Sequence, residues 1–338
     1  MSGARFGFIW LATLRDLQWR WRRFVMAVLA ISLVFAITLL LSGFGESFRV
    51  EAHRLTSLVG ADGYVVQTGS TGPFTSPRPF RDDAVSAISA SSGIRSATPL
   101  IALLQPDIYL LARPPEKPAG HVVADGTFRG DLGEPITIGL KDFTVSELAS
   151  GRTVFGGVPI VEVSVTDAQA SVFAGQPFIT AVAVMGEPTS LPDGYLYVSS
   201  AAAETDFLRP VGVIRTSIRI LSGMLWVVAA AIVGTLVYVS TLERLRDLAV
   251  YKATGAATGD LLAALVFQAV LISLVAASVA IGLAYATAPV FPRPVYFPAT
   301  VLLTLPTVGL VVGLIASAAG LRRAVRVDPA VAMGASGG

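Results

Sequence analysis

The chain has 338 residues, of which 53% are hydrophobic and only 14% are charged, against about 25% charged residues in an ordinary soluble domain. The surplus apolar residues lie in a few long runs, so composition favours a membrane protein. Cysteine is absent, which excludes disulfide bonds, thiolate catalysis and cysteine-based metal sites. The net charge of +2 becomes informative only through its distribution along the chain.

Residues 1–23 are predicted to form an amphipathic helix. Aromatic and aliphatic side chains recur at helical spacing on one face: Phe6, Trp10, Leu14, Leu17, Trp21 and Phe24. Arginines fall elsewhere on the helix, and tryptophan combined with arginine is typical of a helix that lies in the membrane interface. The alternative is an ordinary cytoplasmic helix packed against protein.

Residues 24–44 are the first predicted transmembrane helix. They form a run of 21 residues without charge, and roughly 20 apolar residues in a helix cross a hydrocarbon core about 30 Å thick. The run is too long for the apolar core of a signal peptide, which has about 7–15 residues, and no small-residue cleavage site follows it directly. We therefore expect a retained anchor.

Residues 45–214 are predicted to form an α+β domain outside the cytoplasm. Short β-like runs alternate there with Gly- and Pro-rich turns, and they lie at 63–68, 98–111, 135–139, 157–166, 178–185 and 195–198. Two segments have helical character, 81–92 and 199–210, and Ser199 or Ser200 could cap the second.

This domain shows no pattern typical of a catalytic or metal site. Its histidines, His53 and His121, have no ligand-like neighbour three to five residues away. The adjacent Asp82 and Asp83 would point about 100° apart in a helix rather than form a catalytic pair. Three acids in a Gly-rich loop are expected to be solvated: Asp125, Asp131 and Glu134. The chain is therefore expected to have no catalytic residues, no metal and no cofactor of its own.

Three further apolar runs are predicted to cross the membrane, at 220–242, 261–288 and 298–321. Residues 289–297 would form a short external loop that begins at Pro289, and 322–338 a cytoplasmic tail. The expected fold is an α-helical membrane protein with four transmembrane helices and an α+β extracytoplasmic domain between the first two. Polar side chains inside the spans are expected to make interhelical hydrogen bonds worth about 0.6 kcal/mol on average, and these are Ser32, Thr38, Gln268, Ser273 and Ser278.

The distribution of charge sets the expected orientation. Five arginines and a single acid precede the first run, and three arginines between 322 and 326 follow the last. Residues 45–214 hold 11 basic and 18 acidic residues, a net charge of −7. Both termini are therefore expected in the cytoplasm. Arg215 and Arg219 oppose this orientation at the outer end of the second span, where they are expected to snorkel to lipid phosphates.

The segment 243–260, between the second and third spans, is predicted to be a cytoplasmic helix and loop. Leu245, Leu248 and Lys252 share one helix face, whereas charged residues crowd the other. Gly255 is well placed to end the helix in the left-handed conformation. One interpretation is a structural connector with a solvated face. The other is a stiff helix that docks on a cytoplasmic partner and transmits force to it.

The sequence Glu-Arg-x-Arg-Asp-x-Ala-Val-x-Lys-Ala-Thr-Gly-Ala at 243–256 resembles the signature of the MacB/FtsX-type (type VII) ABC transporter permeases. Asp247 stands where that family more often has Glu, and Thr254 where it more often has Leu or Ile. The basic residues before Pro329-Ala-Val-Ala resemble the C-terminal ending of the family. The predicted topology also matches over the full chain. It is most similar to the short permeases of the DevC and LolC/E types, which lack the fused ATPase domain of MacB.

The resemblance implies the permease subunit of an ABC transporter in a bacterial plasma membrane. Such permeases pair as homodimers or with a related permease and work with two ATPase subunits. The chain has no Gly-x-x-x-x-Gly-Lys-Ser/Thr motif, so ATP and Mg are expected in the separate ATPase. The resemblance implies an ATPase-coupling helix that comprises Glu243, Arg244, Leu245, Arg246, Leu248, Lys252 and Gly255.

In that family, ATP-driven dimerisation of the ATPases moves the coupling helix and, through the spans, the external domain. This mode of action is called mechanotransmission, and it would serve export or extraction of a substrate. Membrane lipid and an extracytoplasmic protein are the other expected partners, and nucleic acid is not. One alternative is an FtsX-like signalling subunit that controls an extracytoplasmic hydrolase or sensor without transport. A membrane-anchored external enzyme is disfavoured because no catalytic constellation is present.

Overall fold

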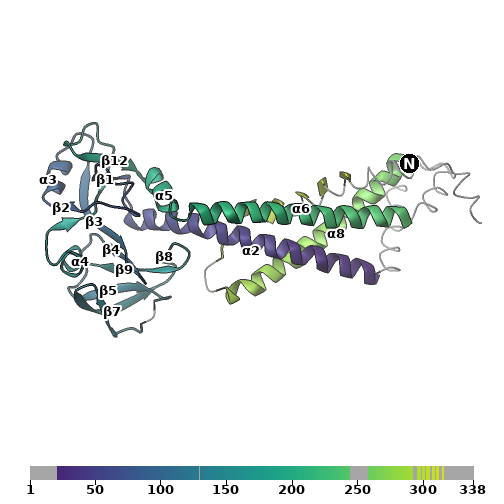
Figure 1. The fold of residues 1–338 in the computed structure, drawn as a ribbon, viewed down its shortest axis with the longest axis horizontal. Coiled ribbons are helices and arrows are strands. Elements are labelled where there is room, and N and C mark those ends of the chain that lie inside the picture. The colour runs from purple at the N-terminus through teal and green to yellow at the C-terminus, as the bar shows by residue number, and fades with distance from the viewer. Residues whose placement is uncertain are drawn as a thin grey trace, which may run out of the picture. The chain divides into compact units, whose positions relative to one another are not determined.

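The computed structural model describes residues 21–128, 130–243, 258–291, 295–297, 299–300, 302–304, 307–308, 310–311 and 314–315. The chain divides into two compact units, Met1–Gly43 with Ser217–Gly338, and Phe44–Thr216 (Figure 1). We call the first the helical unit and the second the α/β domain.

Three long apolar helices account for most of the described helical unit. They are α2 (Trp21–Val59), α6 (Gly212–Glu243) and α8 (Thr258–Thr287), and a short 3-10 helix η1 (Ala288–Val290) follows α8. By length and hydropathy, the segments Phe24–Val59, Gly212–Thr235 and Val266–Val290 could each cross a membrane. They contain or overlap the first three predicted spans.

Several predicted segments fall wholly or largely outside the described residues. Only residues 21–23 of the predicted interfacial helix are described, and none of the tail at 322–338. The predicted fourth span, 298–321, contains only scattered described residues. The count of four spans therefore stays a prediction.

Helix α2 is longer than the span predicted from the sequence. It does not end at Phe44 but continues to Val59, where Gly60 takes a φ of 70° and donates its N–H to the Thr56 carbonyl. Its 39 residues extend about 58 Å at 1.5 Å per residue. The added turns are helical because their apolar residues fall on one face, which is buried in the α/β domain. These residues are Phe48, Ala52 and Leu55.

Side chains from α2, α6 and α8 form one apolar cluster in the helical unit. Large residues come from α2, and small residues on α6 and α8 allow the helices to approach closely. The cluster includes Ile31, Phe35, Leu39, Ala229, Ala276 and Ala280. The ring of Phe35 lies 5.9 Å from that of Trp226 between centroids.

Three hydroxyl groups in these helices bond within their own helix. Ser32, Thr38 and Ser278 each donate to a carbonyl three or four residues earlier, at 3.0, 2.8 and 2.9 Å. The expected interhelical bonds from these side chains were therefore wrong, because the carbonyl of the preceding turn is always within reach of a Ser or Thr hydroxyl.

The α/β domain is built on one mixed sheet, which in the described residues contains ten strands. Its strands are β1 (Gly63–Gln67), β3 (Ser96–Leu104), β4 (Tyr109–Ala112), β5 (His121–Asp125), β6 (Pro135–Ile138), β7 (Lys141–Ala149), β8 (Thr153–Val154), β9 (Val158–Val163), β11 (Ala181–Met185) and β12 (Tyr195–Ser199). The spatial order is β12-β1-β11-β3-β4-β9-β5-β7-β6, with β8 paired to β9. The pairs β4–β9 and β5–β7 are parallel, and the other pairs are antiparallel. Strands β2 (Phe80–Arg81) and β10 (Phe178–Ile179) form a separate pair.

Helices cover both faces of this sheet. Helices α3 (Ala84–Ser89) and α4 (Val165–Val172) contribute to the apolar core on one face. The end of α2 and helix α5 (Ser200–Leu208) contribute to the core on the other. The sheet is thus buried on both sides, which explains why its central strands are almost entirely apolar.

Two predicted strands were too long. The run 98–111 is a hairpin, because a turn closed by Gln105 N–H and the Ile108 carbonyl at 2.8 Å separates β3 from β4. The run 157–166 ends at Val163, where Ser164 accepts a hydrogen bond from Asp167 N–H at 3.0 Å and so caps α4.

The two predicted helices of the domain had different outcomes. The helix expected at 81–92 is reduced to the six residues of α3, since Arg81 pairs with Phe178 in the small sheet. The helix expected at 199–210 is confirmed as α5, and Ser199 caps it by accepting from Ala202 N–H at 3.3 Å.

Candidate functional site

Of the predicted coupling residues, only Glu243 lies within the described part of the chain, as the last residue of α6. The others fall between α6 and α8, outside the described residues: Arg244, Leu245, Arg246, Leu248, Lys252 and Gly255. Their role therefore stays a prediction, and the described site is the junction of α2 with the α/β domain.

A buried carboxylate joins α2 to the turn between β8 and β9. Glu51 is only 1% exposed. Its Oε1 accepts from Thr153 Oγ1 at 2.7 Å, and its Oε2 accepts from Gly156 N–H at 2.6 Å. A buried carboxylate is costly unless it is hydrogen-bonded, and bonds to a charged acceptor are about twice as strong as neutral ones. Glu51 therefore fixes the rotation of α2 about its own axis against this turn.

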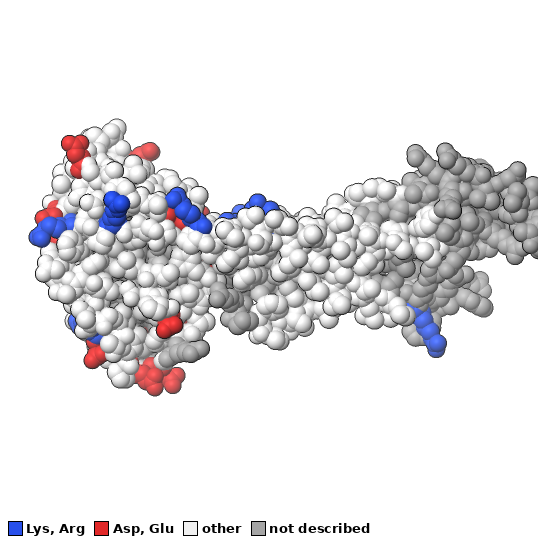
Figure 2. Space-filling view, viewed as in Figure 1, with Lys and Arg blue, Asp and Glu red and all other residues white. Residues whose placement is uncertain are grey.

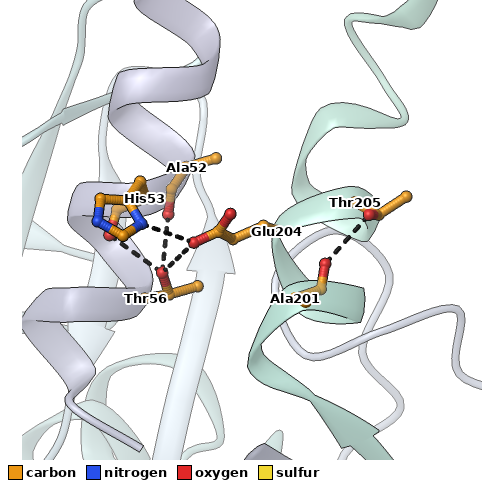
Figure 3. A network of polar contacts seen from close by, with 6 residues as sticks. All are labelled: Ala52, His53, Thr56, Ala201, Glu204 and Thr205. Atoms are coloured by element: carbon orange, nitrogen blue, oxygen red, sulfur yellow. Dashed lines mark hydrogen bonds and ion pairs between the residues drawn. The ribbon is translucent and has the colours of Figure 1, made fainter.

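A second polar contact joins α2 to α5 (Figure 3). Thr56 is 4% exposed, and its hydroxyl lies 2.9 Å from Glu204 Oε1. His53 Nδ1 lies 2.9 Å from the same oxygen, and its side chain is largely exposed. Figure 3 shows the His53 and Thr56 side chains on one side of α2, both directed at Glu204. Since α5 contributes a single carboxylate to both, one substitution there would release both contacts.

Aromatic packing supports these polar contacts. Phe155, in the β8–β9 turn, stacks on Phe207 of α5 with centroids 4.4 Å apart and planes 10° from parallel. Phe155 has a φ of 51°, which costs a non-glycine residue about 1–2 kcal/mol. The Glu51 bond to the neighbouring Gly156 and the stacking on Phe207 both hold this turn in place.

The junction also anchors the helix that leaves the domain. Helix α5 is followed by a hydrogen-bonded turn in which Gly212 N–H donates to the Arg209 carbonyl at 3.1 Å, and α6 begins at Gly212. The end of α2 and the start of α6 are therefore connected through α5 within one small region. A displacement or rotation of either helix would strain the contacts of Glu51 and Glu204.

A cluster of three cations surrounds a second buried carboxylate. Glu162, on β9, is 1% exposed. It pairs through Oε1 with Arg152, and through Oε2 with Lys117 at 3.0 Å and Arg113 at 3.5 Å. Arg152 N–H also donates to Asp125 Oδ2 at 2.7 Å, so Asp125 is a buried structural acid and was wrongly expected to be solvated. The cluster ties two loops, β4–β5 and β7–β8, to the centre of the sheet.

A third acid, Asp167, holds α4 to the β6–β7 hairpin. It pairs with Lys141 and accepts from Gly120 N–H at 2.8 Å. Burial opposes ionisation of this carboxyl, but the hydrogen bonds from Lys141, Gly120 and Ser164 outweigh it and hold the pKa of Asp167 below its usual value.

The junction residues were not identified from the sequence. Glu51 and Glu162 each interrupt an apolar pattern, Glu51 beside Ala52 on a buried helix face and Glu162 within the strand Val158–Val163. An acid in an apolar run is the available signal, but its partners are distant in sequence. Among the described residues, no three His, Asp or Glu side chains are grouped so as to hold a metal ion.

The chain resembles known membrane proteins over almost its whole length. Residues 219–329 match the model of the FtsX-like permease C-terminal domain. The chain is 37% identical over 344 residues to the ABC transporter permease Mb2592 of Mycobacterium bovis and to Rv2563 of Mycobacterium tuberculosis, with 96% of this chain and 99% of each relative covered. A second Mycobacterium tuberculosis permease, Rv0072, is 37% identical over 345 residues with the same coverage.

Among solved structures, the extracellular domain of the noncanonic ABC-type transporter YknZ from Gram-positive bacteria is similar at 10% identity. The likeness covers 40% of this chain and 99% of that domain, with a TM-score of 0.27. The family is shown by the 37% identity to the mycobacterial permeases. The chain belongs to the family of FtsX-like ABC transporter permeases.

Proposed function

We propose that the chain couples ATP hydrolysis by a separate ATPase subunit to movement of its α/β domain outside the plasma membrane. Two ATPase subunits would bind ATP and Mg on the cytoplasmic side, and the permease would act as a homodimer or with a related permease. The chain itself would hold no catalytic site or cofactor. The transported or extracted substrate would be handled by the α/β domain.

The observation that carries this proposal is the continuity of α2. One unbroken helix of 39 residues contains the first apolar span and ends inside the α/β domain. Glu51 and Thr56 fix that end to the β8–β9 turn and to α5. A rigid helix that is held at its end transmits rotation and displacement, whereas a flexible linker would dissipate them. This arrangement suits mechanotransmission.

The charge distribution supports the orientation. Residues 45–214 have a net charge of −7, while arginines flank the N-terminal side of the first span and the C-terminal side of the last. Basic residues near the ends of spans favour the cytoplasm. Both termini and the segment 243–260 would then face the ATPase, with Leu245, Leu248 and Lys252 as its contact surface.

The test is a distance measurement on the full-length permease and its ATPase in lipid nanodiscs. Because the chain has no cysteine, a cysteine introduced at the exposed Leu132 takes a spin label at one known position. The label-to-label distance between two permease copies should change when a non-hydrolysable ATP analogue is added. In the Glu51→Leu variant this change should be lost or strongly reduced, while ATP hydrolysis continues.

Matched controls separate coupling from folding. Arg49→Ala removes an exposed side chain that pairs with Glu46 on the same helix, and it should leave the distance change intact. Thr153→Val removes a single bond to Glu51 and should give an intermediate change. An undiminished response in Glu51→Leu would refute transmission through this junction. Copurification of a hydrolase or sensor kinase with the complex, without any transported substrate, would favour the signalling alternative.

A further inference from the structure

Strand β12 forms one free edge of the large sheet (Figure 1). It pairs with β1 from Gly63↔Ser199 to Gln67↔Tyr195 without a register shift. No strand in the described residues pairs with its other side. This edge is therefore a candidate for pairing with another chain.

The register determines which backbone groups face outward. Ser200 N–H donates to the Asp62 carbonyl at 3.1 Å, and Thr68 N–H to the Gly194 carbonyl at 2.8 Å. In an antiparallel pair the bonded positions alternate, so Leu196 and Val198 also bond to β1. Three intervening residues then point their N–H groups away from β1: Tyr195, Tyr197 and Ser199. Tyr195 N–H meets the Pro192 carbonyl at 3.4 Å, which leaves Tyr197 and Ser199 as the open donors.

Strand β12 lacks the features that usually protect a sheet edge. Its sequence, Tyr-Leu-Tyr-Val-Ser, has no charge, proline or glycine, and Leu196 is 51% exposed. The opposite edge, β6, differs. There Val145 N–H donates to the Glu134 carbonyl, which sets which positions of β6 bond to β7. Pro135 is the next residue and therefore faces outward, and proline has no N–H to donate. Proline therefore interrupts the β6 edge, whereas no proline interrupts β12.

Four carboxylates and three arginines lie around β12. Burial is the main cause that raises the pKa values of Tyr195 and Tyr197. The charge of Asp83 raises the pKa of Tyr195 further, and the charges of Glu187 and Asp62 raise that of Tyr197. Asp193 precedes the strand. Nearby cations are Arg81, paired with Asp83, Arg95, paired with Asp62, and Arg78, which approaches Gly69.

The exposed Glu187 and Asp193 have no ion pair among those found in the described residues. In Figure 2, both acidic and basic side chains lie at the end of the domain where Figure 1 labels β12.

We propose that the open edge of β12 docks an extended, basic segment of a partner protein, which adds to the sheet as a further strand. Backbone bonds from Tyr197 and Ser199 would supply affinity, and the flanking carboxylates would select lysine or arginine side chains. This inference goes beyond the proposed function, since it does not depend on coupling to ATP hydrolysis.

Charge argues against a second copy of this chain as the occupant. An antiparallel β12–β12 pair would bring two copies of Glu187 and Asp193 to one interface, in a domain whose residues 45–214 already carry a net charge of −7. Like charges that face each other across an interface are unfavourable. A basic strand would instead be attracted by the same carboxylates.

The test uses the full-length permease in lipid nanodiscs and a short synthetic peptide in which lysine alternates with valine. Hydrogen exchange is followed at single residues. When the peptide is bound, hydrogen exchange of the Tyr197 and Ser199 amides should slow by at least about tenfold, because these amides become hydrogen-bonded. The amides of Leu196 and Val198, already bonded to β1, should change little. A peptide in which glutamate alternates with valine should give no protection.

Two variants test the two parts of the proposal. Tyr197→Pro removes an outward N–H without removing a backbone bond to β1 and should abolish binding. Tyr197→Phe keeps that N–H and should bind as the unmodified chain does. Glu187→Lys with Asp193→Lys changes only exposed loop side chains, so folding is spared, and this variant should lose the preference for the lysine peptide.

Three results would overturn the inference. The first is exchange at Tyr197 that does not slow with the lysine peptide. The second is equal protection by the lysine and glutamate peptides. The third is strong protection of Tyr197 before any peptide is added, which would mean that a second copy occupies the edge.

Discussion

At the scale of single residues, three buried carboxylates connect segments that are distant in the sequence. Glu51 joins α2 to the β8–β9 turn, Glu162 gathers three loop cations, and Asp167 joins α4 to the β6–β7 hairpin. Each is nearly inaccessible to solvent, so its charge must be balanced by partners. Removing one member leaves the others buried and unpaired, which is why these sites give sharp predictions.

Asp167 predicts a pH dependence of stability. Because its folded pKa lies below its usual value, its stabilising contribution is present above the unfolded pKa of about 3.9 and is lost as pH falls through the lower, folded pKa. Asp167→Asn should destabilise α4 by about 1–3 kcal/mol at pH 7. It should also make the free energy of unfolding depend less on pH at acid pH. Hydrogen exchange of α4 amides in the full-length protein measures both. An unchanged acid profile would contradict the assignment.

Glu162→Gln should destabilise the centre of the sheet. It leaves Arg113, Lys117 and Arg152 together without their shared carboxylate, and breaking a buried ion pair by removing one partner costs about 3–5 kcal/mol. Since these cations are partly exposed, we expect the lower end of that range. Exchange of β9 amides measures the loss. The control is Glu147→Gln, an exposed acid on β7, which should have little effect.

At the scale of elements, α2 is the helix that contributes to the cores of both units. Its first half packs against α6 and α8, and its second half belongs to the core of the α/β domain. Gly43 lies between these halves. A Cβ there would lie 2.7 Å from Val295 Cγ1 and 3.0 Å from the Tyr296 carbonyl oxygen. The glycine therefore permits the chain after η1 to approach the helix backbone closely.

Gly43→Val should destabilise the helical unit, by about 1–3 kcal/mol for overpacking. The expected readout is a lower thermal midpoint of the purified protein in detergent micelles, followed by tryptophan fluorescence, since all four tryptophans belong to this unit. Gly223→Val is the matched control, because a Cβ at Gly223 meets nothing within 4 Å. Equal destabilisation by both variants would show that helix propensity, rather than the close approach at Gly43, determines the loss.

At the scale of the whole molecule, the two units have separate cores and share α2 and α6. Force applied to the helical unit can therefore reach the α/β domain along the backbone of these helices. In the proposed mechanism, that force enters at the segment 243–260.

We predict that Leu245→Asp with Leu248→Asp abolishes stimulation of the partner ATPase while leaving membrane insertion intact. Both leucines lie on the predicted contact face, and a buried charge at a protein interface is strongly unfavourable. The measurement is ATP hydrolysis by the reconstituted complex. Asp247→Ala, on the predicted charged face and outside the set of predicted coupling residues, is the control. Full stimulation in the double variant would rule out docking through this face.

The sequence by itself determined the membrane class, the approximate positions of three spans, the α+β character of the domain and the permease family. These features follow from local composition and periodicity, or from motifs of contiguous residues. Ser199 as a helix cap was also predictable, since capping depends on the two or three residues that follow.

Only the tertiary structure decided where α2 ends, how β3 and β4 divide, and which acids are buried. The helix continues past Phe44 because the sheet, α5 and the β8–β9 turn provide a core for its apolar face. Glu51 lies 102 residues from its partner Thr153, and β12 becomes an edge only through the order of the strands. Such contacts join distant parts of the chain, so no local pattern encodes them.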